Sequence, residues 1–135
     1  MINLTKKTHL CVGIATTLPF YSLLTPISLI GILGSIIPDW DIYLCIFGMK
    51  HRTITHSLLS LIISTLFIYI FSSSIAIVFA LNYLLHLILD SFTKMGVPFL
   101  YPFKNTYYGA KLIKTGGIED LCICAIAIAF ITLII

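Results

Sequence analysis

Charged residues are scarce in this 135-residue chain. Asp, Glu, Lys and Arg together make up 10% of it, whereas a soluble globular domain usually carries about 25%. Apolar residues make up 59%, and the mean hydropathy is +1.10. These values exclude an ordinary soluble domain and indicate a membrane protein. The length accommodates a single domain over residues 1–135, with no room for a second.

Motifs of several common function classes are missing as well. The four cysteines show no CxxC or zinc-finger spacing, so we expect them to be small buried hydrophobic residues. The net charge of +3 comes without a basic run or an RNA-binding motif, which argues against a nucleic-acid partner. Lys6 and Lys7 precede an apolar run, but no small-x-small cleavage site follows. We therefore expect a retained first helix and not a signal peptide.

Five apolar segments predict an all-α integral membrane bundle. They are Leu10–Leu24, Pro26–Ile37, His56–Phe71, Ile75–Phe92 and Ile118–Ile135. A membrane-spanning helix needs about 20 apolar residues, so the first two segments are short. They either cross with a tilt or a kink, or they form a hairpin that re-enters the bilayer, and both alternatives return the chain to the same side. The tripeptide Ser72–Ser74 predicts a tight turn between the third and fourth segments.

All eight cations fall on one side of the membrane when the chain is threaded through these five segments. They are Lys6, Lys7, Lys50, Arg52, Lys94, Lys104, Lys111 and Lys114. The positive-inside rule makes this side cytoplasmic, which predicts a multi-pass protein with its N-terminus in and its C-terminus out.

The histidines and acids lie near that same membrane face. His86 and Asp90 are four residues apart on a predicted helix, so they share one helical face. A lone ionisable group inside a membrane helix costs roughly 2.5 to 3.5 kcal/mol, and such groups are usually paired, metal-bound or functional. A bound metal ion and a hydrogen-bonded pair that joins helices both explain this spacing.

Seven side chains together predict a metal site. They are His9, Asp39, Asp41, His51, His56, His86 and Asp90. Taken singly, several have another explanation, such as a turn after Pro38 for the two aspartates or a surface position for His51 and His56. Taken together they offer the nitrogen and oxygen ligands that zinc or manganese accepts, in a number that suits two ions. Arg52 and Lys94 flank the group and are candidates for binding a substrate phosphate, with positive-inside anchoring as the alternative.

Three ordered motifs resemble a known family. They are Pro38-Asp39-Trp40-Asp41, His51-Arg52-x-x-Thr55-His56-Ser57, and His86-x-x-x-Asp90-x-x-Thr93-x-x-Gly96, which leads to Leu100-Tyr101-Pro102-Phe103. Over His9–Phe103 the chain resembles the YdjM-like family of prokaryotic inner-membrane proteins, described as candidate metal-dependent hydrolases. The resemblance implies metal-binding roles for the seven side chains above. It also implies a distant similarity to zinc-dependent phospholipase C, which has an all-helical fold and a clustered His/Asp metal site.

The function expected from the sequence is metal-dependent hydrolysis of a phosphoester in a lipid or lipid-linked substrate. Asp39 or Asp41 would bridge two ions, and Glu119 is the candidate general base; the sequence assigns no role to Asp120. A non-catalytic metal-binding protein, acting as a carrier, sensor or structural subunit, is the alternative. The membrane lipid is the expected partner. The sequence is compatible with a homo-oligomer but does not decide the oligomeric state.

Overall fold

The computed structural model describes residues 6–45, 48, 52–114 and 116–134. Within these ranges the regular secondary structure is helical and no strand forms, apart from isolated bridges that join Thr93 to Ile113 and Val97 to Tyr108. The helices are α1 (Lys6–Thr17), η1 (Leu18–Leu23), η2 (Pro26–Ser35), η3 (Ile37–Trp40), α2 (Asp41–Leu44), α3 (Leu58–Phe71), α4 (Ser73–Ser91) and α5 (Ile118–Ile134). The predicted all-α class is confirmed.

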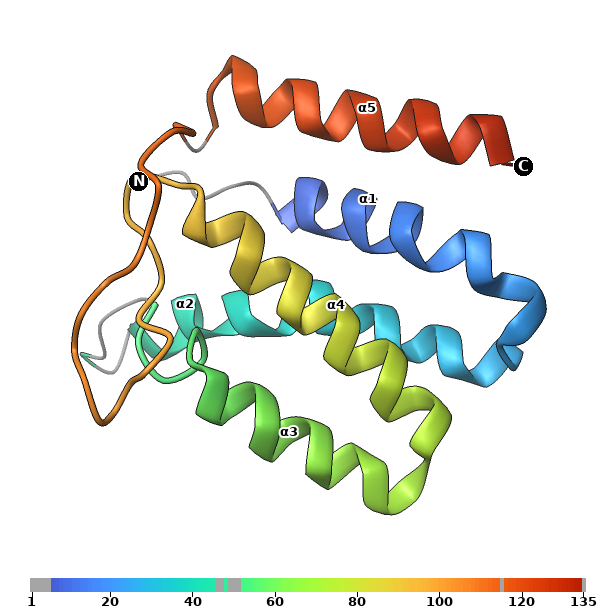
Figure 1. Ribbon diagram of the computed structural model, residues 1–135, viewed down its shortest axis with the longest axis horizontal. Coiled ribbons are helices and arrows are strands. Elements are labelled where there is room, and N and C mark those ends of the chain that lie inside the picture. Colours follow the sequence, from blue (N-terminus) through green and yellow to red (C-terminus); the bar gives the residue numbers. More distant parts are fainter. Residues whose placement is uncertain (1–5, 46–47, 49–51, 115, 135) are drawn as a thin grey trace.

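Helix α4 is the centre of the bundle. It packs against η2, α3 and α1, while α5 lies on the outer side of α1 (Figure 1). Phe79, Tyr83 and Leu87 of α4 form a small buried core with Val97 from the following loop. The side chains of α4 that face inward therefore meet three other segments of the chain.

Serine caps define the hairpin of α3 and α4. The Ser57 hydroxyl accepts a hydrogen bond from the Ser60 backbone N–H at 3.2 Å, and the Ser72 hydroxyl accepts one from the Ile75 N–H at 3.4 Å. Both satisfy backbone donors that a helix start leaves unpaired. The predicted serine turn is correct in place but shorter than expected, because Ser73 already belongs to α4.

The first two apolar segments differ from regular membrane helices. The first changes from α1 to the 3-10 helix η1 just before Pro19, and the second, η2, is 3-10 over ten residues. At about 2.0 Å rise per residue, η2 is about 20 Å long, short of the ~30 Å hydrocarbon core. Gly31 allows η2 to pack directly on the α4 backbone, since a Cβ there would lie 2.7 Å from the Phe79 nitrogen.

One helix within the described residues, α4, is long and apolar enough to cross a membrane. The apolar helices η2 and α3 are shorter. The five-span arrangement therefore stays a prediction.

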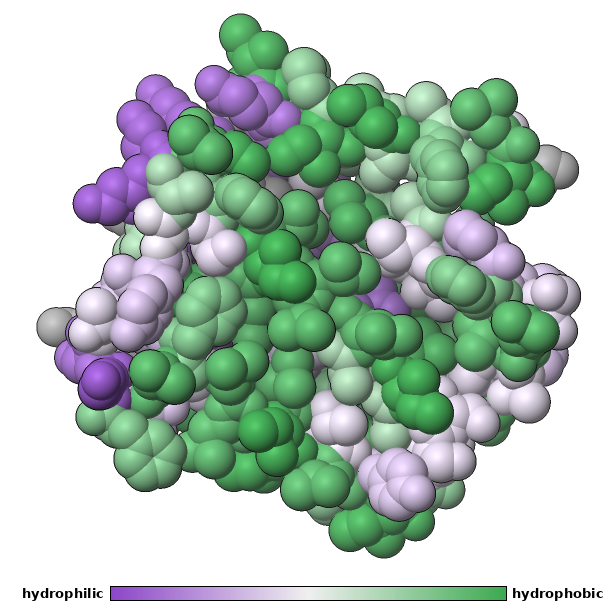
Figure 2. Space-filling model, in the orientation of Figure 1, coloured by the Kyte–Doolittle hydropathy of each residue, from purple (hydrophilic) through white to green (hydrophobic). Residues whose placement is uncertain are grey.

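The surface is apolar while several buried positions are polar. Apolar side chains dominate the face of α4 and α3, and strongly hydrophilic ones gather at the end of the molecule where residues 93–117 lie (Figures 1 and 2). Meanwhile His9, Asp39 and His86 are at most 2% exposed. This distribution is typical of a protein with a lipid-facing exterior and a functional polar interior.

Candidate metal centre

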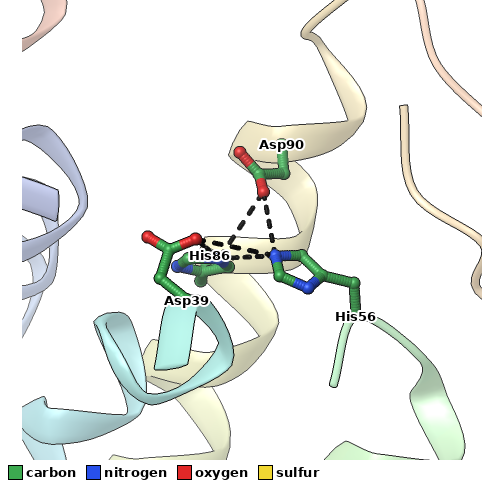
Figure 3. Close-up of side chains that lie close together, drawn as sticks. All are labelled: Asp39, His56, His86 and Asp90. Atoms are coloured by element: carbon green, nitrogen blue, oxygen red, sulfur yellow. Dashed lines mark hydrogen bonds and ion pairs between the residues drawn. The ribbon is translucent and has the colours of Figure 1, made fainter. Parts of the chain in front are cut away.

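Four side chains from three segments converge at the hydrophilic end of α4. Asp39 comes from η3, His56 precedes α3, and His86 and Asp90 come from α4 (Figure 3). All four are buried, and each offers one ligand atom that lies within 4.8 Å of the other three. The i,i+4 spacing of His86 and Asp90 thus places both on the inward face of the helix, as the sequence predicts.

The spacing of these atoms fits one metal ion. His56 Nε2 lies 3.3 Å from His86 Nε2 and 3.2 Å from Asp90 Oδ2, and His86 Nε2 lies 3.5 Å from the same oxygen. Asp39 Oδ1 completes the set at 3.8 and 3.7 Å from the two histidine nitrogens. Four ligands arranged tetrahedrally at about 2.0–2.1 Å from an ion are about 3.3 Å apart. Five of the six atom pairs are thus within about 0.5 Å of this spacing, and the two carboxylate oxygens lie within 4.8 Å of each other, so the group could hold a small divalent ion.

Hydrogen bonds on the far side of each ring orient the histidines. His86 Nδ1 lies 2.7 Å from the backbone oxygen of Ser35. A carbonyl only accepts, so Nδ1 carries the proton and Nε2 keeps its lone pair for the cluster. His56 Nδ1 faces the Thr55 hydroxyl at 3.1 Å and Asp41 Oδ2 at 3.4 Å. Such partners are typical of metal-binding histidines.

The charges of the cluster change the ionisation of its members outside α4. Burial alone would lower the pKa of His56, but Asp39, Asp41 and Asp90 outweigh it and raise this pKa to about 10. Burial alone would raise the pKa of Asp39, but contacts with His56 and the nearby His86 hold it below its usual range. Without an ion, the cluster thus keeps a proton on His56 that balances part of the carboxylate charge.

Asp41 lies behind His56 and outside the four-ligand group. Its Oδ2 accepts hydrogen bonds from the Arg52 backbone N–H at 2.7 Å and the Thr55 hydroxyl at 3.0 Å. The same oxygen lies 3.4 Å from His56 Nδ1, the ring nitrogen that faces away from the four-ligand group. Asp41 is therefore placed to orient His56 and to hold residues 52–55, while its expected role as a ligand or a bridge stays a prediction.

Arg52 is buried beside Asp90. Its side chain is 1% exposed, with one guanidinium nitrogen 2.8 Å from Asp90 Oδ1 and another 2.7 Å from the Thr93 hydroxyl. This burial argues against a surface anchor, whereas the expected binding of a substrate phosphate stays a prediction. The sequence holds a signal for this pairing, since Asp90 and Thr93 are three residues apart at a helix end and present two oxygens to one cation.

His9 approaches the cluster from α1. Its ring stacks on His86 with centroids 3.9 Å apart, and its Nε2 lies 3.3 Å from Asp90 Oδ1. Among the described residues, His9 Nδ1 and both carboxylate oxygens of Asp39 lack a hydrogen-bond partner although they are buried. Buried polar atoms of this kind call for an unseen partner such as an ion or water.

The other candidates from the sequence lie elsewhere. Lys94 and Glu119 are exposed, and Glu119 is at the start of α5, outside the buried cluster. Asp120 is buried and accepts a hydrogen bond from the Gly116 N–H at 3.2 Å. His51 falls outside the residues that the structure describes.

A family model for the YdjM inner membrane protein matches residues 4–135. The chain belongs to the YdjM inner membrane protein family. Searches of the curated proteins and of the solved structures find no match. The YdjM assignment confirms the family resemblance seen in the sequence motifs and places the chain in an inner-membrane family, while the expected similarity to zinc-dependent phospholipase C stays a prediction. Within this YdjM chain, Asp39, His56, His86 and Asp90 form a buried group that could hold a metal ion.

Proposed function

We propose that the chain is a membrane-embedded, metal-dependent hydrolase that acts on a phosphoester of a lipid or lipid-linked substrate. The observation that carries the proposal is the convergence of two imidazole nitrogens and two carboxylate oxygens on one buried point. Zinc is the best fit to this ligand set, and manganese is the alternative.

The ligand types favour catalysis over a purely structural role. Structural zinc sites are usually built with cysteine thiolates, whereas catalytic ones commonly use histidine and carboxylate ligands. A bound ion would supply Lewis acidity and lower the pKa of a bound water toward about 7. Arg52 would fix the orientation of Asp90 and balance its charge, because it holds Oδ1 while Oδ2 faces the cluster.

A second ion is part of the proposal. Asp39 has two carboxylate oxygens without a hydrogen-bond partner among the described residues, and the same holds for Nδ1 of the neighbouring His9. A bridging Asp39 would explain both oxygens, since carboxylates commonly bridge paired ions.

The position of the site suggests a lipid substrate. Strongly hydrophilic side chains gather at the end of the bundle where residues 93–114 lie (Figure 2), whereas the serine turn at the opposite end joins two helices whose sequences contain no lysine or arginine. We propose a multi-pass topology with this charged end in the cytoplasm, following the positive-inside rule. The exposed Lys94 would then meet lipid phosphates at the level of the headgroups.

A second candidate function is metal binding without catalysis. The observation that favours it is the number of ligands, because four buried protein ligands fill a tetrahedral site, whereas catalytic zinc keeps a position open. Bound ion with no turnover would support this candidate.

The test combines elemental analysis with an activity assay on protein purified in detergent and returned to lipid nanodiscs. We expect about one or two equivalents of bound metal in the wild type, release of phosphate or headgroup from a phospholipid panel, and loss of both in His86→Ala and Asp90→Asn. Glu119→Gln is the matched control, because Glu119 is an exposed acid outside the cluster, and it should keep its metal. Metal-loaded wild type that hydrolyses none of the lipids would refute the hydrolase proposal and favour the second candidate.

A further inference from the structure

An apolar groove runs along the seam between α1–η1 and α4. Its volume is about 590 Å³, and its α1–η1 wall consists of Thr16, Thr17, Phe20, Leu23 and Leu24. The opposite wall is the outer face of α4 from Ile77 to Ile88. In Figure 1 the two helices lie close together at the end that carries residues 93–117 and diverge toward the serine turn. The groove therefore opens where the helices part.

The metal cluster and the groove share this seam. His9 of α1 lies 3.3 Å from Asp90 of α4, which marks the closed end of the seam. Ile88, at the near end of the groove, follows His86 by two residues, so its side chain is on the outer face of α4, whereas His86 and Asp90 are on the inward face. A molecule in the groove would thus lie along the outer side of the same α1–α4 seam that His9 and Asp90 close at the charged end.

The few polar side chains of the groove turn their polar atoms away from it. The Thr17 hydroxyl donates to the Gly13 carbonyl at 2.7 Å, and Asn82 Nδ2 donates to Thr17 Oγ1 at 3.0 Å and to the Val78 carbonyl at 2.9 Å. Asn82 Oδ1 lies against Gly13, where a Cβ would come within 2.5 Å of it. The groove therefore offers almost only hydrocarbon surface, which suits an alkyl chain and not a polar ligand.

The length of the groove matches one leaflet. From Ile88 to Ile77 the helix rises about 16 Å at 1.5 Å per residue, and half of the ~30 Å hydrocarbon core is about 15 Å. A lipid anchored by its head at the charged end would reach the bilayer midplane along this groove.

We propose that this groove binds one hydrocarbon chain of the lipid substrate and so selects long-chain amphiphiles with a phosphorylated head. The inference rests on the proposed function, because the cluster is taken to bind the head. The occupant is a single chain, since the groove follows one seam and is walled by two helical segments.

The variant that tests the groove is Leu81→Trp. Leu81 lines the groove and is 58% exposed, so a larger side chain there fills the groove without disturbing the core. Leu66→Trp on α3 is the matched control, because Leu66 is 59% exposed and does not line the groove. Both variants should keep the metal content of the wild type.

Two measurements on nanodiscs separate the groove from the hydrolase activity. The first is photo-crosslinking with a phosphatidic acid that carries a diazirine at mid-chain, with a diazirine diacylglycerol as the analogue without phosphate. We expect the phosphatidic acid to label residues 16–24 and 77–88 several-fold above other lipid-facing residues, an enrichment that Leu81→Trp and the headgroup-free analogue lose. Uniform labelling of all lipid-facing residues would indicate ordinary contact with the bilayer and would overturn the proposal.

The second measurement compares long-chain and short-chain phosphoesters as substrates. We expect Leu81→Trp to lower the turnover of the long-chain lipid at least tenfold and to leave that of a short-chain, water-soluble analogue unchanged. An equal loss on both substrates, or the same loss in Leu66→Trp, would overturn the groove proposal. A wild type that cleaves neither substrate would refute the hydrolase function, while the crosslinking result would still decide whether the groove binds a chain.

Discussion

Replacing Asp41 by Asn separates a supporting residue from a ligand. In the structure Asp41 Oδ2 accepts hydrogen bonds from the Arg52 backbone and the Thr55 hydroxyl at 2.7 and 3.0 Å, and it lies 3.4 Å from His56 Nδ1. Asparagine keeps the size and one acceptor oxygen but loses the charge that makes His56 a stronger ligand. Loss of such a partner typically lowers metal affinity 10- to 100-fold. This corresponds to about 1.4 to 2.7 kcal/mol of binding free energy.

The comparison variant is Asp39→Asn, because Asp39 Oδ1 belongs to the four-atom group itself. The assay is a competition titration with a chromophoric chelator on metal-free protein in detergent, with the stoichiometry checked by elemental analysis. We expect Asp41→Asn to bind the same number of ions more weakly, and Asp39→Asn to lose bound metal. Loss of metal in Asp41→Asn equal to that in Asp39→Asn would refute the assignment of Asp41 to a supporting role.

Three further predictions concern pH, charge and packing. Because the pKa of His56 is raised to about 10, an ion must displace its proton, so the apparent metal affinity should rise about tenfold per pH unit from pH 7 to 9; a flat titration would contradict this. In the metal-free protein a rise in pH should instead lower the free energy of unfolding. The stabilisation from protonated His56 is complete below about pH 6.5 and is lost as the pH rises through about 10. Arg52→Gln removes the partner of the buried Asp90 and should lower the free energy of unfolding by about 3–5 kcal/mol in denaturant titrations, whereas Lys104→Gln at an exposed position should change it little. Gly31→Ala forces a Cβ to within 2.7 Å of the α4 backbone and should cost about 1–3 kcal/mol by the same measurement; a neutral result would show that η2 can move away from α4.

The helices with regular apolar runs could be predicted from the sequence. The segments Ile75–Phe92 and Ile118–Ile135 correspond closely to α4 and α5, because a long apolar stretch without Pro or Gly has few alternatives to a helix. The 3-10 form of η2 could not be predicted, since apolar composition is the same for both helix types. Its geometry depends on close packing against α4, a tertiary contact that local propensity does not contain.

For the site, spacing within one helix was informative and spacing between segments was not. The i,i+4 rule placed His86 and Asp90 on one face, and the structure brings Asp39 and His56 to them. Which aspartate of the Pro38-Asp39-Trp40-Asp41 turn faces the cluster depends on the path of η3 and α2. Two residues of a turn point in different directions, so their types alone could not assign one to the cluster and the other to a place behind His56.

The order of the ligands along the chain has a consequence for biogenesis. Asp39 and His56 leave the ribosome well before His86 and Asp90, and the last two are near the end of α4. All four ligands cannot hold an ion together until α3 and α4 have both formed and packed into their hairpin. Metal capture would then be a late maturation step, and a nascent chain stalled before residue 86 should emerge without its ion.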